Sequence, residues 1–432
     1  MRADAPNRDN TDVAPPTKRY QALLLFASFL MVFHVIGINS VFGIFQDFYT
    51  SPQSNIPGAR GQDALVSLVG TLGSGLTWSG CIFVNPLISR ATDIQRITLC
   101  GAALMSLGLF LASYCSTLWQ LYLTQALLYG GGSALYYFPI MSVAPTYFDA
   151  HRGGAMGVVL AGAGAGGLVF APVLRVLLDR VGVRWALRVL GLWNLAVGVP
   201  VACVVKRRPG FGGAGQTRMT MGLVRRGTFL YQALGAFLQA AGNVIPLYYM
   251  TSYSVSVLAY SASTASLFLA INSAVNSVSR IGMGVLADAV GRQNTMISGV
   301  FLSALSVLAL WYDAPRARFA AFVVLYGVYA GGYNALLPTT ISEIYGVDHY
   351  ARVTGAVYFV RGLGNLLGAP IAGVLLGSHA RTGVGAVGMQ QLQGGFEKVV
   401  MYDGVLLLAA GVCVAYVRWL DARDKGVWQW KA

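Results

Sequence analysis

Charged residues are scarce in this sequence, and that scarcity is informative. Only 11% of its 432 residues are Asp, Glu, Lys or Arg, while 56% are hydrophobic. Soluble domains average about 25% charged residues. So little charge cannot cover a water-exposed surface, which excludes a soluble enzyme or binding domain. We therefore expect a polytopic membrane protein.

Cysteine is also scarce, and its placement excludes several kinds of site. The five cysteines, Cys81, Cys100, Cys115, Cys203 and Cys413, all lie inside apolar runs, and none is spaced like a metal ligand. They predict small packing residues rather than disulfides or a metal centre. The sequence also has no phosphate-binding glycine loop after a strand and no Ser/His/Asp grouping. We expect no enzyme activity, no metal and no cofactor.

Acidic residues are fewer than basic ones, 16 against 30, and the net charge is +14. In a soluble protein this excess would suggest a nucleic-acid partner. Here most basic residues lie in the two tails and in alternate connections between apolar runs. Because basic residues are enriched on the cytoplasmic side of membrane proteins, this pattern places both termini in the cytosol. It leaves no excess charge that would require a nucleic acid.

Long apolar runs define the organisation, because a membrane span needs about 20 apolar residues. We expect twelve spans, at residues 20–49, 63–89, 97–116, 118–147, 153–178, 184–205, 228–254, 263–290, 294–312, 317–345, 350–377 and 399–420. The predicted fold is an all-α membrane protein with two six-helix bundles. The predicted parts are a disordered cytosolic tail (1–19), an N-terminal bundle (20–205), a basic cytosolic linker (206–227), a C-terminal bundle (228–420) and a second cytosolic tail (421–432).

The two halves contain an internal repeat. The segment LLYGGGSALYYFPIMSVAPTYF from Leu127 is similar to VLYGVYAGGYNALLPTTISEIYG from Val324. Each contains Leu-Tyr-Gly and an internal proline, and each is followed by a glycine-rich span. Small residues at such spacing let membrane helices approach closely. A six-span repeat of this kind is typical of alternating-access transporters.

Three segments of the chain match a known pattern. They are GINSVFGIFQDFY over 37–49, the Tyr-Phe, Arg and Ala-Gly steps over 147–167, and the loop motif Gly284-x-x-x-Asp288-x-x-Gly291-Arg292. Together they resemble the monocarboxylate transporter family of the major facilitator superfamily, in its fungal form. The resemblance implies the major facilitator fold and solute transport by alternating access.

The resemblance also implies a gate at the cytosolic ends of the helices. Gly284, Asp288, Gly291 and Arg292 would form the second-half loop motif, while the first-half copy is degenerate and retains Arg90. Glu343, at the cytosolic end of the span over 317–345, is expected to join this charge network.

Arg280 is the candidate anchor for a substrate. It lies near the middle of the span over 263–290, where a guanidinium costs about 2.5–3.5 kcal/mol on insertion scales. Arginine cannot escape this cost by losing its proton. Asn272, Asn276 and Arg280 follow one another at four-residue spacing, so they share one helix face. This stripe predicts the wall of an anion pathway; the alternative is a structural arginine satisfied by carbonyls or a distant acid.

The resemblance implies that Arg280 anchors the carboxylate of the substrate. The residues that carry the proton in other members of the family are, however, missing from this chain. Animal members have an aspartate at the position of Asn276 and a lysine in the first span near Asn39, and this chain has neither. Proton coupling is therefore not implied. His34 in the first span is a candidate proton relay; its alternative role is helix packing.

Further candidates lie on neighbouring spans. Arg361 has no acidic residue nearby in the sequence, and is either a second anion contact, a gate or a structural arginine. Asn39 in the first span is a candidate substrate contact. Aromatic and amide residues on the other spans, among them Tyr137, Asn243 and Asn334, favour a planar or sizeable substrate, although ordinary packing explains many such residues equally well.

These observations favour a secondary transporter of a small organic anion, either monocarboxylate-like or an acidic secondary metabolite. The alternatives are efflux of a neutral, bulky or vitamin-like solute, and a non-transporting membrane sensor of the same fold. We expect a small-molecule substrate and the lipid bilayer as partners. We also expect function as a monomer, in the plasma membrane rather than the vacuole.

Overall fold

The computed structural model describes residues 17–148, 152–208, 221–377 and 386–426. These residues form helices and short connections, with no strand among them. The all-α prediction is therefore confirmed. Most of the predicted first tail, much of the predicted linker and the last six residues lie outside the described ranges.

The N-terminal half makes six passes. Its helices are α1 (Lys18–Ser40), α2 (Phe42–Thr50), η1 (Pro57–Ala59), α3 (Asp63–Ser79), α4 (Cys81–Arg90), α5 (Ile94–Ala112), α6 (Leu118–Leu121), η2 (Tyr122–Leu128), α7 (Tyr129–Val143), η3 (Ala144–Tyr147) and α8 (Arg152–Val204). The long α8 contains two predicted spans, because Gly182 adopts a φ of 76° and breaks the helix between them. Glycine reaches this positive φ without a steric penalty.

The C-terminal half also makes six passes. Its helices are α9 (Met221–Val224), α10 (Gly227–Ser256), α11 (Ala262–Val290), α12 (Arg292–Ser306), η4 (Val307–Trp311), α13 (Arg316–Tyr345), α14 (Val347–Leu376) and α15 (Ala386–Lys425). The last helix begins well before residue 399, where its span was predicted to start. The other helices follow the predicted spans closely.

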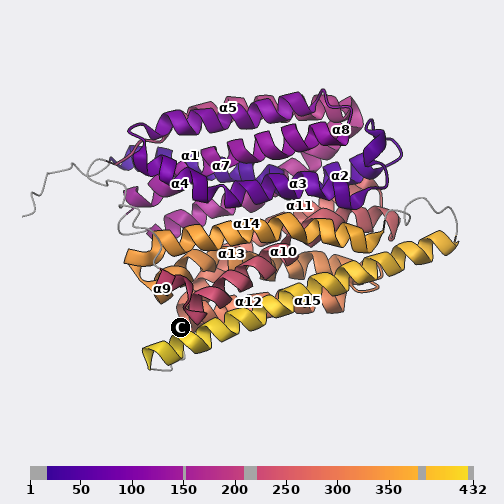
Figure 1. Ribbon diagram of the computed structural model, residues 1–432. Coiled ribbons are helices and arrows are strands. Elements are labelled where there is room, and N and C mark those ends of the chain that lie inside the picture. The colour runs from indigo at the N-terminus through magenta and orange to yellow at the C-terminus, as the bar shows by residue number, and fades with distance from the viewer. Residues whose placement is uncertain (1–16, 149–151, 209–220, 378–385, 427–432) are drawn as a thin grey trace, which may run out of the picture.

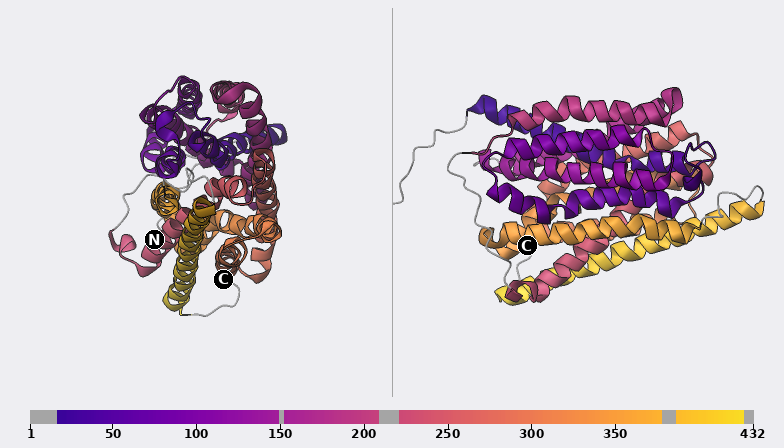
Figure 2. Two further views of the ribbon diagram at one scale, coloured as in Figure 1. Left: turned by 90° about the vertical axis from the view of Figure 1, so that its right-hand side faces the viewer. Right: turned by 45° about the horizontal axis from the view of Figure 1, so that its top comes forward.

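The two halves form two bundles that lie side by side. α1, α3, α5, α7 and α8 occupy one bundle, and α10, α12, α13, α14 and α15 occupy the other (Figures 1 and 2). α1 begins and α15 finishes at the same end of the molecule, which we call the tail end (Figure 1). An even number of passes produces this arrangement.

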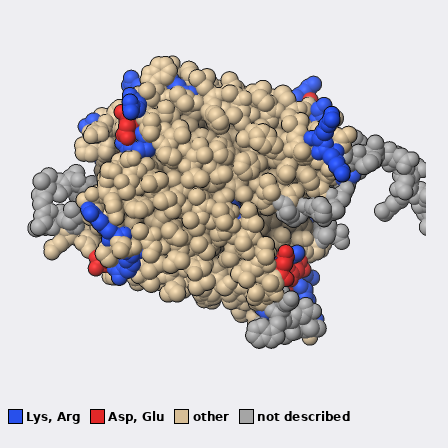
Figure 3. All heavy atoms as spheres, turned by 180° about the vertical axis from the view of Figure 1, so that it is seen from behind, with Lys and Arg blue, Asp and Glu red and all other residues tan. Residues whose placement is uncertain are grey.

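The surface has the charge distribution of a membrane protein. Lys, Arg, Asp and Glu side chains gather at the two ends, and a wide, almost uncharged belt separates them (Figure 3). Eight helical segments of the described chain are long and apolar enough to cross a membrane on their own. α10 and α11 are not among them. The polar stripe of α11 is consistent with a helix that depends on its neighbours for burial.

The bundles meet mainly along two pairs of helices, α3 with α14 and α8 with α11, with smaller contacts between α2 and α10 and between α4 and α14. These contacts depend on small residues. A Cβ atom added to Gly362 of α14 would lie 2.6 Å from the backbone nitrogen of Ser79, and one added to Gly164 of α8 would lie 2.4 Å from the carbonyl oxygen of Ser273. Only glycine permits backbones to approach this closely. The interface therefore requires the glycines that the sequence places there.

Candidate functional site

Arg280 lies on the face of α11 that meets the other bundle. Its Nε donates a hydrogen bond to Asn276 Oδ1 at 3.0 Å. Its Nη1 donates to the carbonyl oxygen of Leu160 in α8 at 3.0 Å. Among the described residues, no Asp or Glu pairs with this guanidinium. Carbonyl and amide oxygens thus hold a positive charge between the bundles without neutralising it.

Arg361 of α14 is held by aromatic rings. Its side chain is 5% exposed, and its Nη2 donates to Asn334 Oδ1 of α13. The guanidinium carbon lies 5.5 Å from the ring centre of Trp78, 5.8 Å from that of Tyr333 and 5.9 Å from that of Tyr358. Distances below about 6 Å allow cation–π attraction. Three π systems therefore compensate part of the burial of this cation.

Trp78 joins the two bundles at this point. Its ring lies 5.4 Å from Tyr137 of α7 in its own bundle and 5.5 Å from Tyr358 of α14 in the other. With the Asn365 amide oriented so that its nitrogen donates to the carbonyl oxygen of Ala240, its oxygen accepts a hydrogen bond from Trp78 Nε1 at 3.2 Å. The indole is thus fixed in place by the opposite bundle.

The two arginines belong to one site. Both contact one turn of α13: a Cβ atom added to Gly331 would lie 3.3 Å from Arg280 Cγ, and Asn334, three residues later, accepts the hydrogen bond from Arg361. The rings of Tyr137 and Tyr358 flank Trp78 at the same place. Like charges interact more strongly in a protein interior than in water, because the effective dielectric constant is lower. We call the set Arg280, Arg361, Trp78, Tyr137 and Tyr358 the arginine–aromatic cluster. It presents two positive charges beside flat aromatic surfaces at the bundle interface.

The structure brings five of the predicted substrate residues to this region: Arg280, Asn276, Arg361, Asn334 and Tyr137. Trp78 and Tyr358 were not predicted. Tyr358 lies three residues before Arg361, so the spacing alone could have predicted that the two residues share a helix face. Trp78 lies in the other half of the sequence, and nothing in its apolar surroundings indicates a cation partner.

Two predicted residues have other surroundings. Asn272 is 2% exposed, and its Nδ2 donates to the carbonyl oxygen of Val323 in α13 at 2.8 Å, so it holds α11 against α13. Asn39 is half-buried on α1, and its side chain makes no hydrogen bond with the described residues. No hydrogen bond joins either residue to the cluster.

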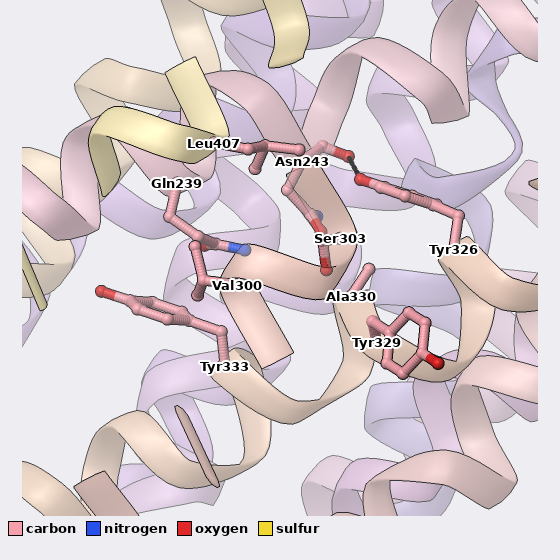
Figure 4. A pocket seen from close by; sticks show the side chains of 9 residues that line it. All are labelled: Gln239, Asn243, Val300, Ser303, Tyr326, Tyr329, Ala330, Tyr333 and Leu407. Carbon is pink, nitrogen blue, oxygen red and sulfur yellow. Dashed lines mark hydrogen bonds between the residues drawn. The ribbon is translucent and has the colours of Figure 1, made fainter. Parts of the chain in front are cut away.

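Asn243 lies inside the C-terminal bundle. It borders a narrow cleft lined by Gln239, Asn243, Val300, Ser303, Tyr326, Tyr329, Ala330, Tyr333 and Leu407 (Figure 4). The carbonyl oxygen of Asn243 accepts a hydrogen bond from the Tyr326 hydroxyl at 3.5 Å. The cleft has no room for a water molecule in this conformation. Tyr333 lines the cleft and also faces Arg361, so the cleft adjoins the cluster.

His34 lies in the core of the N-terminal bundle. Its side chain is fully buried, and its ring centre lies 5.3 Å from that of Tyr136. Its Nδ1 lies 2.6 Å from the carbonyl oxygen of Leu30, which assigns the proton to Nδ1. Nε2 has no hydrogen-bond partner among the described residues. This geometry is typical of a packing histidine with one open nitrogen; the relay role stays a prediction.

The predicted gate motif lies at the tail end. Gly291 adopts a φ of 106° and is the single residue between α11 and α12. Arg292 Nη1 lies 4.0 Å from Glu343 Oε2 of α13. Both residues belong to the C-terminal bundle, so this ion pair does not itself connect the two bundles.

The other gate candidates make fewer polar contacts. Asp288 is exposed and Gly284 is half-buried on α11, while Arg90 is exposed at the last residue of α4. Neither Asp288 nor Arg90 forms an ion pair with another described residue. Their role in gating stays a prediction.

Comparisons with known proteins agree with this architecture. The family model described as Major Facilitator Superfamily matches residues 22–369 and 233–427. The chain is similar to the agnestins efflux protein AgnL12 of Paecilomyces divaricatus, with 26% identity over 94% of this chain and 89% of that protein. It is also similar to monocarboxylate transporter 13 of Bos taurus, with 27% identity over 84% of each chain.

Solved structures show the same fold. One of them, a bacterial homolog to the human lysosomal transporter Spinster in an inward-facing and occupied conformation, matches with a TM-score of 0.72. That match covers 96% of this chain and 100% of the other, at 15% sequence identity. The predicted twelve-helix fold and the resemblance to fungal transporters and monocarboxylate transporters are confirmed. The chain belongs to the major facilitator superfamily and is a multi-pass membrane transporter rather than an enzyme.

Proposed function

We propose that the transported solute is a small organic anion, either monocarboxylate-like or an acidic secondary metabolite. One observation carries this proposal: Arg280 and Arg361 lie together at the bundle interface, and no described carboxylate pairs with either. Positive charge without a fixed counter-ion inside a membrane protein is costly and marks solute pathways. A bound carboxylate would supply the missing negative charge.

The contacts suggest how the solute would be held. A carboxylate can accept two parallel hydrogen bonds from an arginine fork. Arg280 Nη1 now donates to Leu160 of the opposite bundle, so an arriving carboxylate would compete with a contact that connects the bundles. Because Trp78, Tyr137 and Tyr358 lie beside the arginines, a planar apolar body could stack against them. Rocking of the bundles along α3–α14 and α8–α11 would then expose the site alternately to each side.

We propose that transport is directed outward, across the plasma membrane. Support comes from the similarity to a protein named as an efflux protein. The chain also lacks the aspartate and lysine that the resemblance leads one to expect at Asn276 and near Asn39. We further propose that the protein transports its solute as a monomer, because a single chain contains the whole arginine–aromatic cluster.

A neutral or bulky solute is the second candidate. The observation that favours it is the aromatic content of the cluster, where Trp78, Tyr137 and Tyr358 would bind a flat neutral molecule as well as a charged one. The two candidates differ in their dependence on Arg280. A sensor without transport activity has no supporting contact in the described chain.

Flux measurements on purified protein in liposomes separate these candidates. The probes are a panel of aromatic monocarboxylates, with benzoate first, and the corresponding neutral amides. We expect carboxylate flux in the unmodified protein, loss of that flux in Arg280→Gln, and little flux of the amides. Arg175→Gln is the matched control, since Arg175 already pairs with Asp179 within α8. Equal flux of amides and carboxylates, or normal carboxylate flux in Arg280→Gln, would overturn the anion proposal.

A further inference from the structure

Asp403 is a buried carboxylate that the proposed function does not use. It lies in α15, and its side chain is 0% exposed inside the C-terminal bundle. Neither carboxylate oxygen has a hydrogen-bond partner among the described residues. It packs against α10, where a Cβ atom added to Gly242 would lie 3.1 Å from Asp403 Oδ1. The acid therefore occupies a protein interior and not a lipid-facing surface.

The groups around Asp403 offer no positive charge. Tyr326 of α13 and Tyr402 of α15 are the titratable groups that interact with it electrostatically. α10 contributes Gly242, and the neighbouring η4 contributes Leu308, which packs at Gly404. No Lys, Arg or His of the described chain acts on the carboxyl group. An ionised carboxylate without a partner is strongly disfavoured in such a place, so the group is stabilised by binding a proton.

The internal repeat shows that packing does not require this acid. The segment GVPVACV from Gly198 aligns with GVCVAYV from Gly411, and the same offset pairs Gly191 with Gly404. It also pairs Leu190 with Asp403. Leu190 is 2% exposed, so a leucine fills the corresponding core position of the N-terminal bundle. The acid in the second bundle therefore has a role other than filling space.

The cleft beside the cluster also approaches this acid. Tyr333, which faces Arg361, lines the narrow cleft together with Gln239 and Asn243, as Figure 4 shows. Leu407, one helical turn after Asp403, lines the same cleft. The cleft excludes water in the present conformation. Proton exchange would then require the bundle to open, which keeps a proton from leaking across.

We propose that Asp403 is a proton-binding site of this transporter. On the open side its carboxylate takes one proton from water and becomes a neutral carboxylic acid. After the conformational change it returns that proton to water on the other side. Each cycle then moves one proton through the C-terminal bundle. The transport part of this inference rests on the proposed function, but the proton site itself does not.

Infrared spectroscopy tests the site without a substrate. Reconstituted protein is titrated from acidic to alkaline pH, and the carbonyl stretch of protonated carboxyl groups is followed. We expect a band in the unmodified protein that is lost on deprotonation and is absent in Asp403→Asn. Asp421→Asn is the control, because Asp421 is bonded to Gln293 and Lys425, and it should retain the band. Identical spectra of the unmodified protein and Asp403→Asn throughout the titration would overturn the proposal.

A second variant guards against misfolding. Asp403→Leu copies the residue that the repeat places at Leu190, so it should fold and should also lack the band. A transport arm uses benzoate flux under an imposed proton gradient, which should respond to the gradient in the unmodified protein and not in Asp403→Asn. Arg280→Gln should lose benzoate flux and keep the band. If Arg280→Gln loses benzoate flux while every variant, Asp403→Asn included, retains the band, the proton site is refuted and the anion proposal stands.

Discussion

Arg361 of α14 lies over the ring of Trp78 of α3, with its guanidinium carbon 5.5 Å from the ring centre. The cation comes from one bundle and the aromatic ring from the other. The same indole donates to Asn365, again across the interface. A transporter that rocks its bundles must change this contact, so Trp78 would couple the state of the interface to the charge that we propose binds the solute.

Replacing Trp78 by leucine should weaken anion binding. The change removes one of three rings around Arg361, and a cation–π contact contributes about 0.5–2 kcal/mol. We therefore expect the KM for carboxylate flux to rise roughly 2- to 30-fold, and less in Trp78→Phe, which keeps a ring. Concentration-dependent flux in liposomes measures this. Trp119→Phe serves as the control, because Trp119 is 60% exposed; an unchanged KM in Trp78→Leu would remove the ring from the site.

Placing an acid at Asn276 should make transport strongly pH-dependent. Asn276 Oδ1 lies 3.0 Å from Arg280 Nε, so an aspartate there would neutralise the arginine when ionised. Protonation of that aspartate at lower pH would free the arginine again. The ratio of Asn276→Asp flux to unmodified flux should therefore rise as pH falls. A flux ratio that is constant with pH would show that Arg280 does not bind the negative charge of the solute.

Adding a methyl group at Gly362 should strain the bundle interface. The new Cβ atom would lie 2.6 Å from the backbone nitrogen of Ser79, which cannot move as a flexible side chain would. Overpacking of this kind costs about 1–3 kcal/mol. We expect Gly362→Ala to unfold at a lower temperature in detergent than the unmodified protein. Gly157→Ala is the matched control, since a Cβ there meets no atom within 4 Å; equal melting of the two variants would contradict the steric account.

Replacing His34 by glutamine distinguishes its two roles. Because the ring is fully buried and Nδ1 is bonded to Leu30, we expect the pH profile of flux to stay unchanged. Because the packing around the ring is lost, protein yield and melting temperature should fall while the pH profile stays the same. A flattened pH profile would instead identify His34 as the proton relay.

The sequence was sufficient for the architecture because the information it requires is local. Apolar run length specifies the spans, and the breaks between them fall at residues such as Gly182 and Gly291. The isolated charge of Arg280 and its spacing from Asn276 also follow from the chain alone. These features depend on neighbours within a few turns of one helix, so no tertiary information was needed.

The composition of the site required the tertiary structure. Asn272 and Asn276 share a helix face, yet Asn272 bonds to Val323 within its own bundle while Asn276 supports Arg280. Helical periodicity places residues on a face but does not say which neighbour that face meets. The same limit applies to Asn243, which turned out to border a cleft inside one bundle.

Hydropathy and helical period by themselves determined that this chain crosses a membrane twelve times as two repeated halves, with a permanent cation at mid-span. Only the tertiary structure decided that Trp78 and Arg361 meet, and that Asp403 is enclosed without a hydrogen-bond partner among the described residues. The reason is physical. The free energy of burying a helix in the membrane follows from the apolar residues of that helix alone. Cation–π contacts, and the absence of a partner for a buried charged group, depend instead on which distant segments pack together.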